Sequence, residues 1–160
     1  MSFAIFSDSS CNLPKAQLEE FQVQIISSSY EREGKLITCP PYPEDFDGHE
    51  YYNFLRNKGV VKTSLIPAAQ MEDAFRPVLA AGEDVLYITL SSGISGTVAS
   101  GLQAAQALME EFPQRQVRVL DSMGAGFGIG LLLGRASDDR KAGLNLDQTY
   151  ASLERDRDNL

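Results

Sequence analysis

The sequence predicts an α/β fold in which a mainly parallel sheet is flanked by helices. Short apolar runs alternate with longer segments whose apolar residues recur at helical spacing, as in sheets whose strands are joined by helices. The chain has 160 residues, enough for one domain or for one lobe of a larger protein. Apolar residues make up 43% of it, which suffices for a hydrophobic core.

The first part of the chain predicts two strands, a helix between them and a short return strand. Residues 3–6 form an apolar run that ends in a polar turn, and Pro14 suits the first turn of the helix that follows. Residues 23–30 predict the second strand. A polar turn comes next, in which Gly34 is available for a positive φ, and residues 36–38 return as a short edge strand.

The middle of the chain predicts two helices joined by a connector. Three prolines between residues 40 and 43 exclude regular structure there. A helix is expected from Asp47 or Gly48 to about Gly59, and residues 62–67 are interpreted as a connector. The next helix contains Pro77, which is expected to kink or split it.

The second half predicts two more strands and three helices. Residues 85–90 form the central strand, and residues 117–120 form another. A glycine-rich helix then extends to about Ala142, where Gly143 suits the position after the helix end, and a last helix covers residues 147–158. The helix between the two strands, residues 95–112, has a stripe of apolar residues: Val98, Leu102, Ala105, Leu108 and Phe112.

Composition excludes several classes of protein. The net charge of −8 argues against nucleic-acid binding, because nucleic-acid-binding proteins usually carry a basic face. No apolar run is long enough to span a membrane, and the N-terminus lacks the basic region of a signal peptide. Cys11 and Cys39 have no metal-ligand spacing, so we expect free thiols in a reducing cytoplasm. Neither a metal nor a cofactor is expected.

Small polar residues follow three of the predicted strands, at residues 8–10, 91–95 and 121–122. Ligands of parallel sheets bind beyond the carboxyl ends of the strands, and the connector with Thr63 and Ser64 can join them there. Residues 91–97 also open a helix, whose free N–H groups and dipole favour an anionic oxygen. Hydroxyls and glycines suit hydrogen bonding to a carboxylate or phosphate better than proton transfer.

Each group also has a purely structural interpretation. Ser95 can cap the helix that follows it, an interaction of about 1 kcal/mol. Thr63 and Ser64 can cap the next helix in the same way, and Asp121 can bind neighbouring backbone amides. The glycines of residues 124–130 are expected to permit close helix packing.

Enzyme motifs are incomplete. The nucleophile elbow requires a glycine where residues 93–97 have Thr97. The dinucleotide fingerprint fails because Ile129 or Leu131 stands at its third glycine. The only histidine is His49, which no motif connects to Ser95. We therefore expect no catalytic residue.

Taken together, the sequence resembles the DegV family of bacterial fatty-acid-binding proteins. The resemblance covers nearly the whole chain, and its most specific part is the block that ends in Ser-Gly-Thr. Four segments carry it in order: Phe6-Ser7-Asp8-Ser9-Ser10-Cys11-Asn12-Leu13-Pro14, Lys62-Thr63-Ser64, Ser91-Ser92-Gly93-Ile94-Ser95-Gly96-Thr97 and Val119-Leu120-Asp121-Ser122.

The resemblance implies a carrier that holds a long-chain fatty acid. The hydroxyls that match Thr63 and Ser95 would bind the carboxylate, with Ser64, Ser92 and Gly96 completing the ligand-binding set, and the tail would lie in an apolar tunnel. A separate fatty-acid kinase subunit would receive the lipid and form an acyl phosphate. Two alternatives remain: a small serine-dependent enzyme that handles acyl or phosphate groups, and a lobe fragment with no ligand of its own.

Two departures from the family pattern stand out. The family usually has a proline soon after the Thr-Ser pair, whereas Leu65 and Ile66 precede Pro67 here. Residues 1–160 also match only the N-terminal α/β lobe, and the family's second lobe, which covers the tail and supplies basic residues, is absent from the sequence. We expect the uncovered apolar face to weaken lipid binding or to cause self-association.

Overall fold

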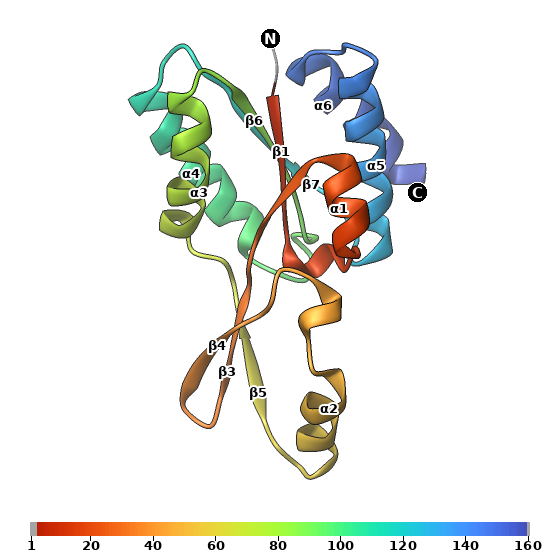
Figure 1. Ribbon diagram of the computed structural model, residues 1–160. Helices are drawn as coiled ribbons and strands as arrows, with labels where there is room; N and C mark the ends of the chain where they lie inside the picture. The colour runs from red at the N-terminus through yellow and green to blue at the C-terminus, as the bar shows by residue number, and fades with distance from the viewer. Residues whose placement is uncertain (1–2, 160) are drawn as a thin grey trace.

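The computed structural model describes residues 3–159 as two sheets, each with its own helices (Figure 1). A four-stranded parallel sheet lies between two helical layers, and a smaller three-stranded sheet extends from the edge at which its strands end. Met1, Ser2 and Leu160, which the predicted lobe of residues 1–160 includes, lie outside the described residues. The predicted α/β class is therefore confirmed.

The large sheet has the order β2-β1-β6-β7, and each neighbouring pair is parallel. Every residue of β1 and β6 is buried, as expected for central strands covered on both faces. The strand predicted at residues 85–90 is thus central. The four strands are β1 (Phe3–Asp8), β2 (Val23–Ile26), β6 (Asp84–Thr89) and β7 (Val117–Asp121).

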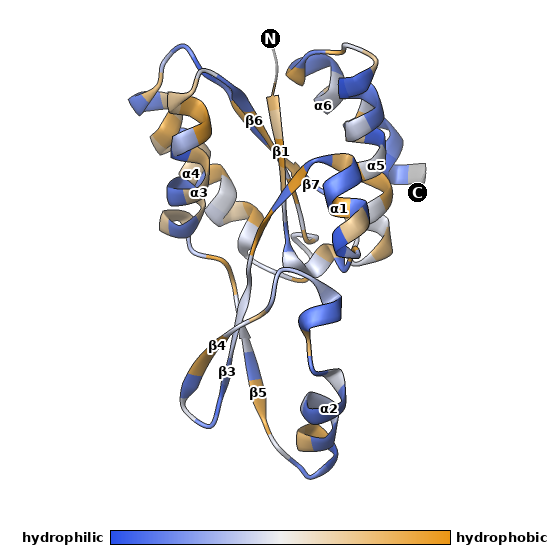
Figure 2. Ribbon diagram, in the orientation of Figure 1, coloured by the Kyte–Doolittle hydropathy of each residue, from blue (hydrophilic) through white to orange (hydrophobic). Residues whose placement is uncertain are grey.

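Helices cover both faces of this sheet. One face packs against α1 (Lys15–Phe21), α5 (Phe127–Lys141) and α6 (Leu146–Asp156). The other packs against α3 (Ala68–Ala80) and α4 (Thr97–Glu111). In Figure 2 these helices carry hydrophobic and hydrophilic residues side by side, as expected for helices buried along one stripe.

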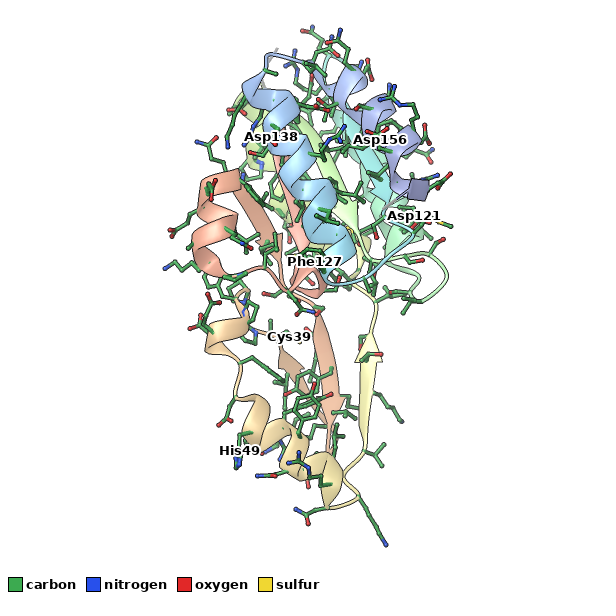
Figure 3. The ribbon with its side chains drawn as sticks, turned by 90° about the vertical axis from the view of Figure 1, so that its right-hand side faces the viewer. Cys39, His49, Asp121, Phe127, Asp138 and Asp156 are labelled. Carbon is green, nitrogen blue, oxygen red and sulfur yellow. The ribbon has the colours of Figure 1, made fainter. Side chains whose placement is uncertain are left out.

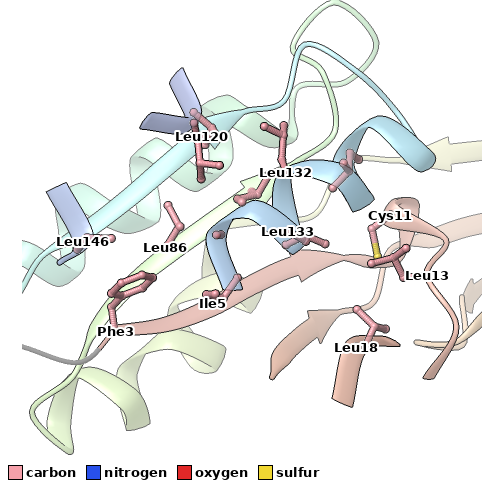
Figure 4. Packing of buried hydrophobic residues seen from close by; sticks show 14 residues of the cluster. Phe3, Ile5, Cys11, Leu13, Leu18, Leu86, Leu120, Leu132, Leu133 and Leu146 are labelled. Atoms are coloured by element: carbon pink, nitrogen blue, oxygen red, sulfur yellow. The ribbon is translucent and has the colours of Figure 1, made fainter. Parts of the chain in front are cut away.

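Alternate residues of β1 point into two separate cores. Phe3 and Ile5 belong to the core beneath α5 and α6, where they pack with residues such as Leu133 (Figure 4). Ala4 and Phe6 belong to the core beneath α3 and α4. The period of two in a strand therefore divides one apolar run between both layers.

The apolar stripe predicted for α4 is only partly correct. Leu102 is 55% exposed, and the helix instead buries small residues such as Gly101 and Ala104. A Cβ atom at Gly101 would lie 3.1 Å from the Val119 side chain and 3.3 Å from the Tyr87 ring. The helix therefore approaches the sheet too closely for a large side chain at that position.

The smaller sheet corrects two predictions. Residues 23–30 are not one strand, because the chain leaves the large sheet after Ile26 and enters the small one at Ser29. Residues 62–64 are not a connector but part of the third strand. The antiparallel order is β4-β3-β5, with bounds β3 (Ser29–Arg32), β4 (Lys35–Thr38) and β5 (Val61–Ser64), and α2 (Gly48–Arg56) lies beside it.

Several local predictions are confirmed. Gly34 and Gly143 have φ values of +76° and +87°, and Asp47 caps α2 by accepting a hydrogen bond from the Glu50 N–H. One alternative for Pro77 is wrong, because it lies inside α3 without splitting the helix. The only regular structure in the described proline-rich segment is one 3₁₀ turn, η2 (Pro43–Asp45). Two further 3₁₀ turns are η1 (Ser9–Cys11), after β1, and η3 (Arg157–Asn159), after α6. Cys11 and Cys39 are free thiols, as expected.

No helix within residues 3–159 is both long enough and apolar enough to cross a membrane.

Candidate functional site

The carboxyl ends of β1 and β6 form the point at which the chain turns away in opposite directions. From β1 the chain crosses through α1 to β2, and from β6 it crosses through α4 to β7. The two crossover helices lie on opposite faces of the sheet. Open α/β sheets bind ligands in the crevice at such a switch point.

Asp8, at the end of β1, is a buried carboxylate at this switch point. Its Oδ2 accepts hydrogen bonds from the Thr89 hydroxyl at 2.5 Å, the Tyr87 hydroxyl at 3.2 Å and the Leu90 N–H at 3.4 Å. Its Oδ1 accepts from the Ser10 N–H at 2.9 Å and from the Ser10 hydroxyl. Asp8 therefore ties the ends of the two central strands together.

Tyr87 serves this network as a proton donor. Burial, and then the neighbouring Asp8 carboxylate, raise the pKa of Tyr87 well above its ordinary value. The phenol consequently stays protonated at physiological pH.

A cleft of about 730 Å³ opens between this edge and the small sheet. Its volume lies within the range of small-molecule sites. Small polar residues line it from the ends of β1 and β6, and also from the start of β3 and the end of β5 in the small sheet. Aromatic and aliphatic residues line it mainly from the small sheet, the proline-rich segment and α2, together with Leu90 and Ile94 after β6. The polar set comprises Asp8, Ser9, Ser10, Asn12, Ser28, Ser29, Thr63, Ser64, Ser95, Gly96 and Thr97; the remainder is Tyr30, Cys39, Pro40, Tyr42, Pro43, Phe46, Tyr51, Tyr52, Leu65, Ile66, Leu90 and Ile94.

Two pairs of hydroxyl groups belong to the polar residues that line the cleft. The Ser95 and Thr97 hydroxyl oxygens are 2.8 Å apart, and the Ser95 oxygen also accepts from the Thr97 N–H at 3.2 Å. The Ser9 and Ser28 hydroxyl oxygens are 2.7 Å apart, and the Ser9 oxygen accepts from the Ser28 N–H at 3.1 Å. Both pairs contribute polar hydrogens to the cleft without a charged donor.

Gly96 permits close contact between the two parts of the chain that carry Thr63 and Ser95. A Cβ atom at Gly96 would lie 3.2 Å from Cδ2 of Leu65. The next residue, Ile66, donates its N–H to the Thr97 hydroxyl oxygen at 3.3 Å. Leu65 and Ile66, which separate the Thr-Ser pair from Pro67, thus make this contact.

Four of the five predicted ligand-binding residues line the cleft: Thr63, Ser64, Ser95 and Gly96. Ser92 is not among the lining residues; it is exposed, and its N–H donates to Asp121 at 3.1 Å.

The purely structural interpretations of these polar residues are confirmed in part. Ser95 does satisfy a helix-terminal N–H, as the capping interpretation proposed, although the N-cap position itself is Gly96. Capping by Thr63 and Ser64 is wrong, because they lie on β5 and Pro67 precedes the next helix. Asp121 binds backbone amides as expected.

The glycine-rich helix packs closely at Gly130 and Gly134. A Cβ atom at Gly130 would lie 2.8 Å from the Leu13 side chain, and one at Gly134 would lie 3.4 Å from the Phe21 ring.

The aromatic lining was missed as part of the site. Tyr51 is its centre, with ring centroids 5.4 Å from Tyr30, 5.2 Å from Phe46 and 5.4 Å from Tyr52. The sequence signal was the density of aromatic residues that follows the proline cluster, in a segment for which only a helix was predicted. Ser28 and Ser29 were missed because they were assigned to the interior of a strand.

The cleft offers no basic partner for an anion. Among the described residues that line it there is no lysine, arginine or histidine, and Asp8 is the one charged side chain. Figure 3 shows Cys39 between the two sheets and His49 further away on α2. His49 contacts Asn53, the two side-chain nitrogens being 3.2 Å apart, and is not part of the lining.

The sequence of this chain matches a known protein family. A family model described as an uncharacterised protein of the DegV family matches residues 2–160. The chain belongs to the DegV family. A DegV domain-containing protein from Clostridium perfringens is 28% identical over 162 residues, which cover 99% of this chain and 54% of the relative. This DegV chain thus spans about half the length of the curated relatives that it matches.

Two solved structures are similar to this chain in fold and are described as binding a fatty acid. A Thermus thermophilus DegV family protein, described by its fatty acid binding, has a TM-score of 0.85 and 28% identity; the match covers 98% of this chain and 54% of that one. A protein from Eubacterium ventriosum, described as binding stearic acid, has a TM-score of 0.84 and 26% identity, with coverage of 95% and 52%.

Proposed function

We propose that this chain binds a long-chain fatty acid in the cleft, with the carboxylate at Thr63 and Ser95. The observation that carries the proposal is that one cleft is lined by both a set of small hydroxyl side chains and a set of aromatic side chains. A fatty acid likewise combines a polar head group with an apolar tail. Each buried CH₂ group contributes about 0.8 kcal/mol, so the tail supplies most of the affinity and the hydroxyls select the head group.

The fatty-acid-binding relatives from Thermus thermophilus and Eubacterium ventriosum support the proposal. Ser64 and Gly96 belong to the proposed head-group site because they line the cleft and directly follow Thr63 and Ser95 in the chain. The proposed role of Ser92 is indirect, through the turn that it forms beside Asp121.

The chain would act as a carrier that presents its lipid to a separate fatty-acid kinase subunit in the cytoplasm. The serine-enzyme alternative is not favoured, because within the described lining no base contacts the Ser95 hydroxyl, whose partner there is Thr97. The fragment alternative predicts that the isolated chain does not fold, and a single cooperative denaturation transition would contradict it.

Calorimetric titration with palmitate tests the head-group assignment. Thr63→Val and Ser95→Ala each remove one hydrogen bond to a charged group, which is worth about 1.5–3 kcal/mol, so we expect the Kd to rise by about 10- to 150-fold. Thr38→Val and Ser152→Ala are matched controls outside the cleft and should leave the Kd unchanged. Parent-like affinity in both cleft variants would show that the assignment is wrong.

The open side of the cleft leads to a further expectation. A cleft encloses a tail less completely than a closed tunnel, so this chain should bind palmitate weakly or self-associate to cover its apolar face. Sedimentation that shows a monomer, together with tight palmitate binding, would contradict this expectation.

A further inference from the structure

The Thr97 hydroxyl joins the two segments that carry the proposed head-group residues. Thr97 is only 4% exposed. Its oxygen accepts from the Ile66 N–H at 3.3 Å and lies 2.8 Å from the Ser95 hydroxyl oxygen. Ile66 comes two residues after the end of β5, the strand that carries Thr63. One side chain thus holds the turn before α4 against the end of β5.

Burial decides the direction of the bond between Ser95 and Thr97. A hydroxyl group has one proton and two lone pairs. Among the hydrogen bonds that involve residues 3–159, the Ser95 oxygen is the one acceptor within reach of the Thr97 proton. A buried O–H without an acceptor is unfavourable, and Thr97 is almost fully buried although it borders the cleft, whereas Ser95 is half-buried and lines the same cleft. The Thr97 hydroxyl is therefore the donor.

Ser95 is left with a single function toward a ligand. Its oxygen accepts from both the hydroxyl and the N–H of Thr97, which occupies both lone pairs. Its own proton remains free to donate into the cleft. A carboxylate only accepts hydrogen bonds and, because it is charged, accepts strong ones. An alcohol is neutral and brings a proton for which Ser95 has no lone pair.

We propose that Thr97 is a positioning residue that fixes Ser95 as a hydrogen-bond donor and so makes the head-group site prefer a carboxylate over an alcohol. This inference rests on the proposed function and adds to it the origin of head-group selectivity.

Calorimetric titrations of the same protein with dodecanoate and with dodecanol test the inference. Thr97→Val keeps the shape of the side chain but removes its hydroxyl, so Ser95 is no longer held as a donor. We expect the preference for the acid to fall by about tenfold, the low end of the range for a charge-assisted hydrogen bond. Thr97→Ser should restore the preference. Thr149→Val is the matched control, because Thr149 is fully buried in α6 and its hydroxyl has no hydrogen-bond partner within residues 3–159.

A second measurement needs no ligand. The χ1 angle of Ser95, measured by NMR couplings, should hold one rotamer in the parent and in Thr97→Ser, and should average between rotamers in Thr97→Val. A fixed χ1 angle in Thr97→Val would overturn the positioning role, as would an unchanged acid preference. If the parent binds neither compound, the proposed function is wrong, and so is the proposed selectivity for a carboxylate. The χ1 measurement still decides whether Thr97 positions Ser95.

Discussion

Replacement of Asp8 by asparagine tests whether the buried carboxylate holds the ends of the central strands together. Asp8 is 2% exposed and accepts from five donors, two at Oδ1 and three at Oδ2. An amide NH₂ group cannot accept, so Asp8→Asn places a donor against one of these sets. The Ser10 and Thr89 hydroxyls can rotate to accept, but a backbone N–H cannot.

One backbone N–H, that of Ser10 or of Leu90, therefore loses its acceptor in either amide orientation. A buried donor without a partner costs about 1–3 kcal/mol, and the remaining bonds weaken because their acceptor is no longer charged. We expect the free energy of unfolding to fall by about 2–4 kcal/mol in total. For a chain of this size, such a loss lowers the Tm by roughly 5–12 °C.

Urea denaturation at pH 7, followed by circular dichroism, measures the change. Asp73→Asn is the control, because it removes the same charge from an exposed position on α3. It should remain within about 0.5 kcal/mol of the parent. If Asp8→Asn is as stable as this control, the reasoning about Asp8 is refuted.

Three further predictions concern other parts of the structure. Burial alone would raise the pKa of Asp121, but the hydrogen bonds from Ser92 and Met123 and the charge of Arg157 outweigh it and lower the pKa. The ionised form of Asp121 therefore stabilises the fold above the ordinary carboxyl pKa of about 3.9, and this contribution is lost as the pH falls through the lower pKa of the folded state. The loss of unfolding free energy caused by Asp121→Asn, measured by urea titration, should therefore shrink on acidification. A stability difference between parent and variant that widens at low pH would contradict this. Tyr51→Ala removes three ring contacts of about 0.5–1.5 kcal/mol each and should weaken palmitate binding while leaving the preference for acid over alcohol intact, as measured by calorimetry. Gly101→Val should destabilise the protein to urea by about 1–3 kcal/mol through overpacking, whereas Ala99→Val on the exposed side of α4 should not.

The large sheet was predictable because its strands are buried on both faces. The runs that became β1 and β6 are almost entirely apolar, and burial of every residue in them leaves little ambiguity. The helix ends were also predictable where local chemistry determines them, as for Asp47 and Gly143. In each case the signal lies within a few residues of the feature that it determines.

The smaller sheet was not predictable in the same way. Residues 61–64 are half-buried or exposed throughout, so β5 shows neither an apolar run nor a clear alternation. Its pairing with β3 is set by contacts far away in the sequence, such as Thr63 opposite Tyr30. The break after Ile26 does have a local signal, the three consecutive serines at residues 27–29, but the apolar residues on both sides favoured the interpretation as one strand.

The candidate site could likewise be predicted only in part from the sequence. Small polar residues at a strand end pointed to Ser95, and the family resemblance pointed to both Thr63 and Ser95, but the cleft that they share depends on the smaller sheet. The apolar stripe predicted for α4 was only partly correct for a related reason. Periodicity selects bulky residues such as Leu102, whereas close approach to Tyr87 selects Gly101, and that contact is visible only in three dimensions.

The most direct test of the proposed lipid cleft is a calorimetric series of saturated acids, from decanoate through dodecanoate and tetradecanoate to palmitate. If the tail lies along the aromatic lining, each added CH₂ group should tighten binding by about 0.8 kcal/mol, roughly fourfold in Kd. The heat capacity change should also become more negative with each step. Affinity that does not vary with tail length, or no binding by any of the four acids, would contradict the account.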